Sequence, residues 1–143
     1  MELMVFNVVR VVRVEPGAML DDSVFDQWLY IEFGGSTIPV FDHEMIAPDY
    51  ASGELHEVRL GLMATSVQYT NSSASGLAGN RYYGRVVSVR ELDGFFSYLL
   101  DINGLKVHLS DDTQYSLGDY LVVQGRLDLE DIKLPNTALW NEV

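Results

Sequence analysis

The stretch from residue 97 to residue 111, SYLLDINGLKVHLSD, decides the fold class. Asn103-Gly104 is the strongest short hairpin signal, because a type I′ turn needs a positive φ at both central residues. With a two-residue turn there, successive side chains alternate between two faces. The apolar face is expected to be core and holds Tyr98, Leu100, Ile102, Leu105, Val107 and Leu109. The other face is mostly polar and is expected to meet water; its cross-strand pairs are Asp101–Lys106, Leu99–His108 and Ser97–Ser110.

Strand signals also dominate the rest of the chain. Further apolar or β-branched runs, bounded by turn residues, cover 8–14, 28–33, 37–41, 58–69, 81–90 and 120–127. The best helical candidate is a short turn within 43–51, and Pro48 limits its length. The sequence therefore predicts an all-β protein of about eight strands.

The two halves of the chain resemble one another. The segment 70–80, TNSSASGLAGN, is small, polar and glycine-rich, which predicts a flexible linker or a long hairpin loop. It separates a first β unit, 1–69, from a second, 81–143. The aligned pairs are 10–14 with 85–89, 28–42 with 97–111, and 53–54 with 118–119. These matches favour an internal repeat. The alternative is that any two β-meanders look alike.

The second unit, YYGRVVSV…YLLDINGLKVHLSD…LGDYLVVQGRLDL, resembles the OB-fold family of five-stranded Greek-key barrels. Gly84, the Asn103-Gly104 hairpin, Gly118-Asp119 and Gly125 carry the resemblance. It implies two OB-like units packed together, or one composite barrel or sandwich. It also implies binding of oligonucleotides, oligosaccharides or proteins.

The fifth strand departs from the OB pattern. From Leu127 the chain reads LDLEDIKLPNTALWNEV, which is short and contains Pro135, and the first unit lacks a clear fifth strand before 70–80. Either the barrels are incomplete, or the halves exchange strands and complete each other. A unit of about 70 residues is marginal alone, which favours halves that share a core.

Composition narrows the classes of partner. The 143 residues include 9 Lys or Arg and 21 Asp or Glu, for a formal net charge of −12. The resulting field repels phosphates and anionic lipid headgroups. The chain contains no cysteine, which excludes disulfides, Cys-ligated zinc and a Cys nucleophile. The start, MELMVF, lacks a basic n-region, and no run approaches 18 apolar residues. A cytoplasmic location without a membrane partner is therefore expected.

The first hairpin carries a candidate interface. With Gly34-Gly35 as its turn, the core face holds Leu29, Ile31, Phe33, Ser36, Ile38 and Val40. The opposite face gathers Trp28, Tyr30 and Phe41 where solvent would favour polar groups. An exposed patch of this kind marks a binding surface. Alternatively, the rings pack against the other half of the chain or a second subunit.

The sequence contains two other candidate clusters. Tyr83, Arg85 and Arg90 lie in the one segment that mixes aromatic and basic residues, and single-strand binders stack bases beside cations. Strand alternation separates Tyr83 and Arg85 from Tyr82. His43-Glu44, His56-Glu57, Asp42 and Asp49 share a turn-rich region, but no pair has the i, i+4 histidine spacing of a helical metalloprotease site, so we predict no metal and no cofactor.

Catalytic signals are weak. The candidate bases are His43, His56 and His108, and the chain contains neither a nucleophile elbow nor a Walker-type phosphate loop. We predict no catalytic residue and no enzyme activity. The preferred hypothesis is a noncatalytic module for protein–protein interaction or self-association, an acidic regulator or antidote that covers a basic target surface. The alternative is an OB-type binder of single-stranded nucleic acid or oligosaccharide.

Overall fold

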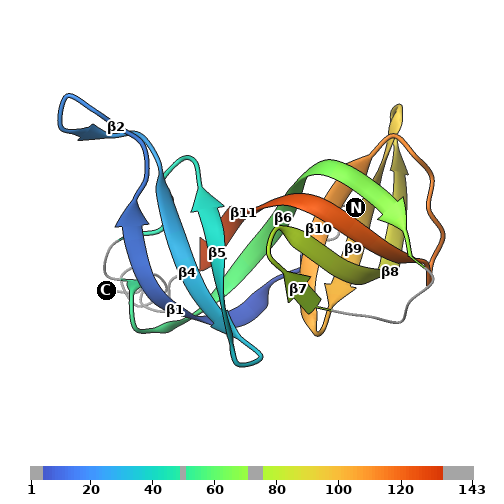
Figure 1. Cartoon of the computed structure of the whole chain (residues 1–143), viewed down its shortest axis with the longest axis horizontal. Helices are drawn as coiled ribbons and strands as arrows, with labels where there is room; N and C mark the ends of the chain where they lie inside the picture. Colours follow the sequence, from blue (N-terminus) through green and yellow to red (C-terminus); the bar gives the residue numbers. More distant parts are fainter. Residues whose placement is uncertain (1–4, 49–50, 71–75, 134–143) are drawn as a thin grey trace, which may run out of the picture. The chain divides into compact units, whose positions relative to one another are not determined.

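The computed structural model describes residues 5–48, 51–70 and 76–133, and it confirms the all-β class. Figure 1 shows the strands of this part of the chain. Eight of them have seven residues or more, and β2, β3 and β7 are short. The strands are β1 (Asn7–Pro16), β2 (Met19–Leu20), β3 (Ser23–Val24), β4 (Gln27–Phe33), β5 (Ser36–Asp42), β6 (Leu55–Tyr69), β7 (Gly76–Ala78), β8 (Arg81–Leu92), β9 (Phe95–Ile102), β10 (Leu105–Asp111) and β11 (Tyr120–Lys133).

The chain divides into two compact units. The first unit comprises 1–60 and 128–143, and the second comprises the continuous segment 61–127. Both boundaries fall inside long strands, so β6 and β11 each contribute one part to each unit. This division differs from the expected boundary at 70–80. Residues 71–75 of that segment lie outside the described residues, and β7 within it pairs antiparallel with β8 of the second unit.

In the first unit, the last strand segment of the sheet pairs with the first strand. β1 pairs with β4, β4 with β5, β5 with β11, and the start of β6 pairs back with β1. β5 and β11 run parallel and are joined at one residue pair, Phe41 and Asp128. β11 and β6 are neighbours in the sheet, and Arg59 Nε lies 3.3 Å from Glu130 Oε1 between them. The end of β11 thus supplies a fifth strand segment that the sequence of the first half lacks.

The second unit has the same strand order. β8 pairs with both β9 and β11, β9 pairs with β10, and β6 lies between β10 and β11. Here β6 and β11 approach so closely that a Cβ on Gly125 would overlap the carbonyl oxygen of Met63. A glycine is required at this point because the two backbones leave no room for a side chain. The fifth segment of this unit precedes its other strands in the sequence.

The aligned repeat positions share a β-bulge and the same pair of backbone hydrogen bonds. β1 has a bulge between Val11 and Arg13, and β8 has one between Val86 and Ser88. Gly53 and Gly118, both with positive φ, donate to the carbonyls of Val11 and Val86 at 2.6 and 2.8 Å. Each valine N–H in turn donates to the carbonyl of the acidic residue that follows the glycine, at 3.0 and 2.9 Å. The same local geometry therefore recurs at the positions that the sequence repeat aligns.

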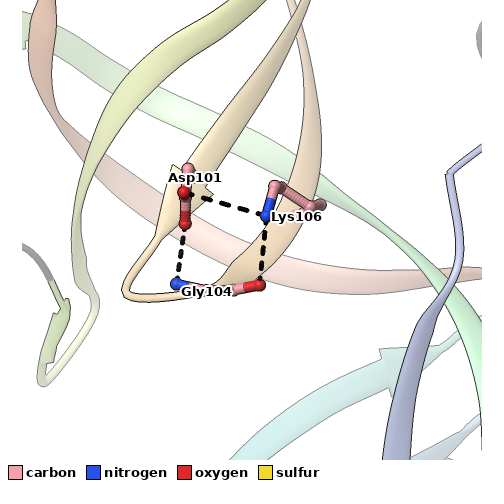
Figure 2. Close-up of polar contacts among 3 residues, drawn as sticks. All are labelled: Asp101, Gly104 and Lys106. Atoms are coloured by element: carbon pink, nitrogen blue, oxygen red, sulfur yellow. Dashed lines mark hydrogen bonds and ion pairs between the residues drawn. The ribbon is translucent and has the colours of Figure 1, made fainter.

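Both hairpins have the predicted register. Asn103 and Gly104 have positive φ, as do Gly34 and Gly35. The apolar face of the β9–β10 hairpin is buried: Tyr98, Leu100, Ile102, Leu105, Val107 and Leu109 are each at most 5% exposed. On the outer face, Lys106 Nζ lies 3.7 Å from Asp101 Oδ2, and Asp101 Oδ1 accepts a hydrogen bond from the Gly104 N–H (Figure 2).

The expectation for Leu99 was wrong. Its side chain lies on the outer face of β9, yet it is only 7% exposed. Its cross-strand neighbours are Ser88 on β8 and His108 on β10. A central strand position is flanked on both sides, so an outward side chain there can still be largely covered. In the first hairpin, Leu29, Ile31, Ile38 and Val40 are buried as expected, whereas Phe33 is half-buried and Ser36 is exposed beside the turn.

Candidate functional site

The rings of Trp28, Tyr30 and Phe41 share the outer side of β4 and β5. We call these three residues the aromatic face. All three are half-buried, while the alternating residues Leu29 and Ile31 are fully buried beneath them. Trp28 and Phe41 form a cross-strand pair with ring centroids 5.0 Å apart and planes tilted by 56°. Such aromatic pairs add about 0.5–1.5 kcal/mol beyond the area they bury.

A guanidinium already stacks on the aromatic face. The Arg13 Cζ atom lies 3.9 Å above the centroid of the Tyr30 ring, and Arg13 Nε donates to Glu15 Oε1 at 2.7 Å. The bulge in β1 sets this arrangement, because it brings Arg13 opposite Tyr30 in the register. Simple alternation from Val11, which is buried, would have turned Arg13 inward. Sequence reasoning missed Arg13 for this reason.

A cleft of about 360 Å³ adjoins the aromatic face at the joint between β5 and β11. We call it the acidic cleft. Phe41 belongs to both features. The lining residues come from β5 and the turn after it, from β6 and from β11: Phe41, Asp42, His43, Glu44, Ile46, Arg59, Asp128, Leu129 and Glu130. Four carboxylates thus face one half-buried arginine, so the lining is acidic.

Asp42 has a structural role in this cleft. It is 1% exposed, and its carboxylate accepts hydrogen bonds from Gln27 Nε2 at 2.8 Å and from the backbone N–H groups of Ile46 and Ala47 at 3.0 and 2.9 Å. These bonds fix the turn that follows β5. The carboxylates of Glu44, Asp128 and Glu130 are more accessible, because each residue is half-buried or exposed.

The second unit presents the same face without aromatic rings. The repeat aligns Trp28 with Ser97 and Phe41 with Ser110. Ser97 and Ser110 are also a cross-strand pair, on β9 and β10. The same hairpin therefore forms with serines at both positions, and folding of such a hairpin does not require the two rings.

The other predicted cluster is only partly brought together. Tyr83 faces outward beside Val122, and Arg85 faces outward beside Tyr120, whereas Tyr82 is buried. Tyr83 lines a polar groove of about 260 Å³; its other lining residues are Ser66, Gln68, Arg81, Val122 and Gln124. Neither Arg85 nor Arg90 lines this groove. Arg90 pairs with Ser97 beyond the β8 bulge, which returns it to the same outer face as Arg85.

Charge is divided unequally between the two units. The first unit contains four Lys or Arg and fifteen Asp or Glu residues, a net charge of −11. The second contains five and six, a net charge of −1. Nearly all of the net negative charge of the chain, −11 of −12, therefore belongs to the unit that carries the aromatic face.

Sequence reasoning also missed the β2–β3 hairpin, which extends beyond the other strands of the first unit (Figure 1). Met19, Leu20 and Phe25 on it are 57, 64 and 55% exposed. Asp21 and Asp22 form its tip with positive φ. The available signal was this short Asp-Asp turn between apolar residues, since aspartate tolerates the left-handed region better than most side chains.

The shifted pKa values belong to buried tyrosines rather than to a surface site. The Tyr98 hydroxyl donates to the Thr113 carbonyl at 2.6 Å and accepts from the Tyr115 N–H at 2.8 Å. The Tyr115 hydroxyl donates to Asp111 Oδ2 at 3.0 Å. Burial, and then Asp111, raise the pKa of Tyr115 to about 12, and burial raises the pKa of Tyr98 as well. This network holds the segment between β10 and β11.

The histidines and acids do not form a metal centre in the described part of the chain. His56 is 4% exposed with Nε2 3.0 Å from the Ala51 carbonyl, and His43 lies 6.0 Å from the Phe41 ring. Among residues 5–48, 51–70 and 76–133, no three His, Asp or Glu side chains lie close enough together to hold a metal ion. Asp49 lies outside the described residues.

No helix within the described residues has the length and apolar character needed to span a bilayer. Compared with models of known protein families and with curated protein sequences, the chain matches none.

Proposed function

We propose that this protein is a noncatalytic binding protein whose first unit docks a partner protein with a basic surface. The aromatic face supplies the apolar contact, and the surrounding acidity supplies charge complementarity. Aromatic side chains are enriched at binding interfaces because they bury a large area at low conformational cost. The ring of five strand segments in each unit supports the OB-like interpretation, and such barrels also serve as protein-docking surfaces.

The comparison between the repeats carries this proposal. The second unit builds the equivalent hairpin with Ser97 and Ser110 in place of Trp28 and Phe41. Half-buried rings that the hairpin does not need for folding call for another explanation, and contact with a partner provides it. The net charge of −11 on the same unit would steer a basic partner toward this face and raise its association rate.

The test replaces Trp28 or Phe41 by serine, which is the residue at both aligned positions of the second unit. Wild type, Trp28→Ser and Phe41→Ser are used to capture proteins from the native source, and the captured protein is then purified and titrated directly. We expect a basic protein that binds wild type and binds each serine variant at least tenfold more weakly, with weaker binding as salt rises.

The matched control is Tyr83→Ser in the second unit. It removes a half-buried aromatic ring from an outer sheet face of similar construction. Retained binding by Tyr83→Ser and lost binding by the first-unit variants would support the aromatic face. Equal binding by all variants, or a captured protein with an acidic surface, would contradict the proposal.

A second candidate function, binding of single-stranded nucleic acid, is favoured by one observation. The second unit is nearly neutral, and its groove combines Arg81 and Tyr83 with two glutamine amides and no carboxylate. Stacking on a ring beside a cation is how sequence-tolerant single-strand binders work. A labelled oligothymidylate, titrated at 50 and 200 mM salt against wild type and Arg81→Gln, would test it. Salt-independent binding, or none, would exclude it.

A further inference from the structure

We infer that the aromatic face and the acidic cleft together recognise an arginine side chain of the partner. This inference rests on the proposed docking function and adds the chemical group that is recognised. The guanidinium would stack on the paired rings of Trp28 and Phe41, and the carboxylates of the cleft that Phe41 also lines would meet its charge.

The aromatic face already accepts a guanidinium at one position. Arg13 stacks over Tyr30 at 3.9 Å, well within the 6 Å range of a cation–π contact. Tyr30 is two residues from Trp28 on the same side of β4, so the two rings present the same kind of surface. An arginine from a partner would repeat on the Trp28–Phe41 pair what Arg13 does on Tyr30. Tryptophan is the ring that binds cations best.

The charge of the cleft selects a cation. Glu44, Asp128 and Glu130 line it together with Arg59, which lies 3.3 Å from Glu130. The carboxylates outnumber the one arginine even when Asp42, which is saturated by Gln27 and the backbone, is left aside. A volume of about 360 Å³ is at the lower end of the 300–1,000 Å³ typical of ligand pockets, which suits a side chain rather than a folded element.

Arginine fits these features better than lysine. Its planar guanidinium stacks on a ring face and still presents N–H donors at its edge for carboxylates. An ammonium is a compact, strongly hydrated charge that loses more solvation in the same place. The combination of half-buried aromatic rings with carboxylates beside them therefore points to arginine.

The experiment uses three fluorescein-labelled peptides built on one Gly-Ser background. The first carries two arginines, the second two citrullines, which keep the shape and lose the charge, and the third two lysines. Titration of the whole protein at 50 mM salt should give the order arginine, lysine, citrulline, with about tenfold between first and last. Trp28→Ser and Phe41→Ser should each weaken the arginine peptide about tenfold. Glu44→Gln should weaken it severalfold.

The control for charge is Glu54→Gln, because Glu54 is exposed, belongs to the first unit and does not line the cleft. It should leave arginine-peptide binding within twofold of wild type. Melting curves of the serine variants, compared with wild type, verify that the first unit stays folded.

Three results would overturn the inference. Citrulline and arginine peptides could bind equally, the serine variants could bind the arginine peptide as wild type does, or the arginine peptide could fail to bind. Each differs from failure of the docking function, because the captured basic protein would still lose binding to Trp28→Ser in those cases. If that protein binds Trp28→Ser unchanged, the docking function itself fails.

Discussion

At the scale of single residues, two aspartate side chains, one buried and one half-buried, fix the segments that follow the hairpins. Asp42 closes the first hairpin and binds the backbone of the turn after it, and Asp111 accepts from the Thr113 N–H and the Tyr115 hydroxyl after the second. The two aspartates occupy aligned repeat positions. Removing the hydrogen-bond partners of buried Asp42 would be costly, because the desolvation of its carboxylate would then be uncompensated.

Alkaline pH should weaken the second unit through Tyr115. The pKa of this residue is 10.0 in the unfolded chain and about 12 when folded, because of burial and of Asp111. As pH rises, Tyr115 therefore loses its proton in the unfolded chain before it does so in the folded protein. Its contribution to the free energy of unfolding is fully present below pH 10 and is lost as pH rises toward 12. The loss is at most about 3 kcal/mol, and Tyr98 acts in the same direction.

Urea unfolding at pH 8 and pH 11 checks this expectation. The Tyr115→Phe variant is the control: it should be less stable at pH 8, where it lacks the bond to Asp111, but should lose less stability than wild type on going to pH 11. An identical pH dependence of wild type and variant would contradict the assignment.

At the scale of elements, turn chemistry and a period of two residues were enough to predict both long hairpins. The Asn103-Gly104 and Gly34-Gly35 turns fix the register, and the register fixes which side chains are core. The bulges at residues 12 and 87 could not be predicted, because they lie in runs of β-branched residues without any glycine or proline signal. Each bulge shifts the alternation by one residue, which is why Arg13 and Arg90 lie where they do.

Truncation of the hairpin core should be costly. Leu100 is fully buried on β9 opposite Val107, so Leu100→Ala should lower the free energy of unfolding by about 2–5 kcal/mol. Val8→Ala is the control, since Val8 is 61% exposed on β1, and it should change stability by less than about 0.5 kcal/mol. Chemical denaturation of wild type and both variants measures these changes in the free energy of unfolding. A cost near zero for Leu100→Ala would mean that the hairpin register is wrong.

At the scale of the whole molecule, the sequence predicted two related units but not how the chain divides between them. The fifth segment of the first unit lies after the entire second unit, at 128–133, and no local pattern marks that connection. The placement of Trp28, Tyr30 and Phe41 on one side of a hairpin could be predicted, because it depends on a single local hairpin. The acidic cleft could not be predicted, because it depends on contacts between distant parts of the sequence. Its lining combines residues near 43, at 59 and near 129, which only the tertiary structure brings together.

Fragments should reveal this division. The segment 61–127 contains every strand part of the second unit, so it should fold alone and melt cooperatively. A fragment of 76–143 lacks β6, which lies between β10 and β11 in the sheet order, and should remain unfolded. Circular dichroism and proton NMR of the two fragments test this. A folded 76–143 together with an unfolded 61–127 would instead support the boundary at 70–80.

The concentration of charge in the first unit has a cost for its own stability. Carboxylates that total a net charge of −11 repel one another in the folded state, and the repulsion is relieved as the chain expands. Salt shortens the Debye length from about 30 Å at 0.01 M to about 8 Å at 0.15 M, so it should stabilise this unit and leave the second nearly unchanged. Both tryptophans of the chain belong to sequence segments of the first unit, so tryptophan fluorescence can follow this unit during melting at the two salt concentrations. The negative charge that would attract a basic partner thus also destabilises the folded first unit. Binding of that partner should reduce this charge repulsion, as salt does.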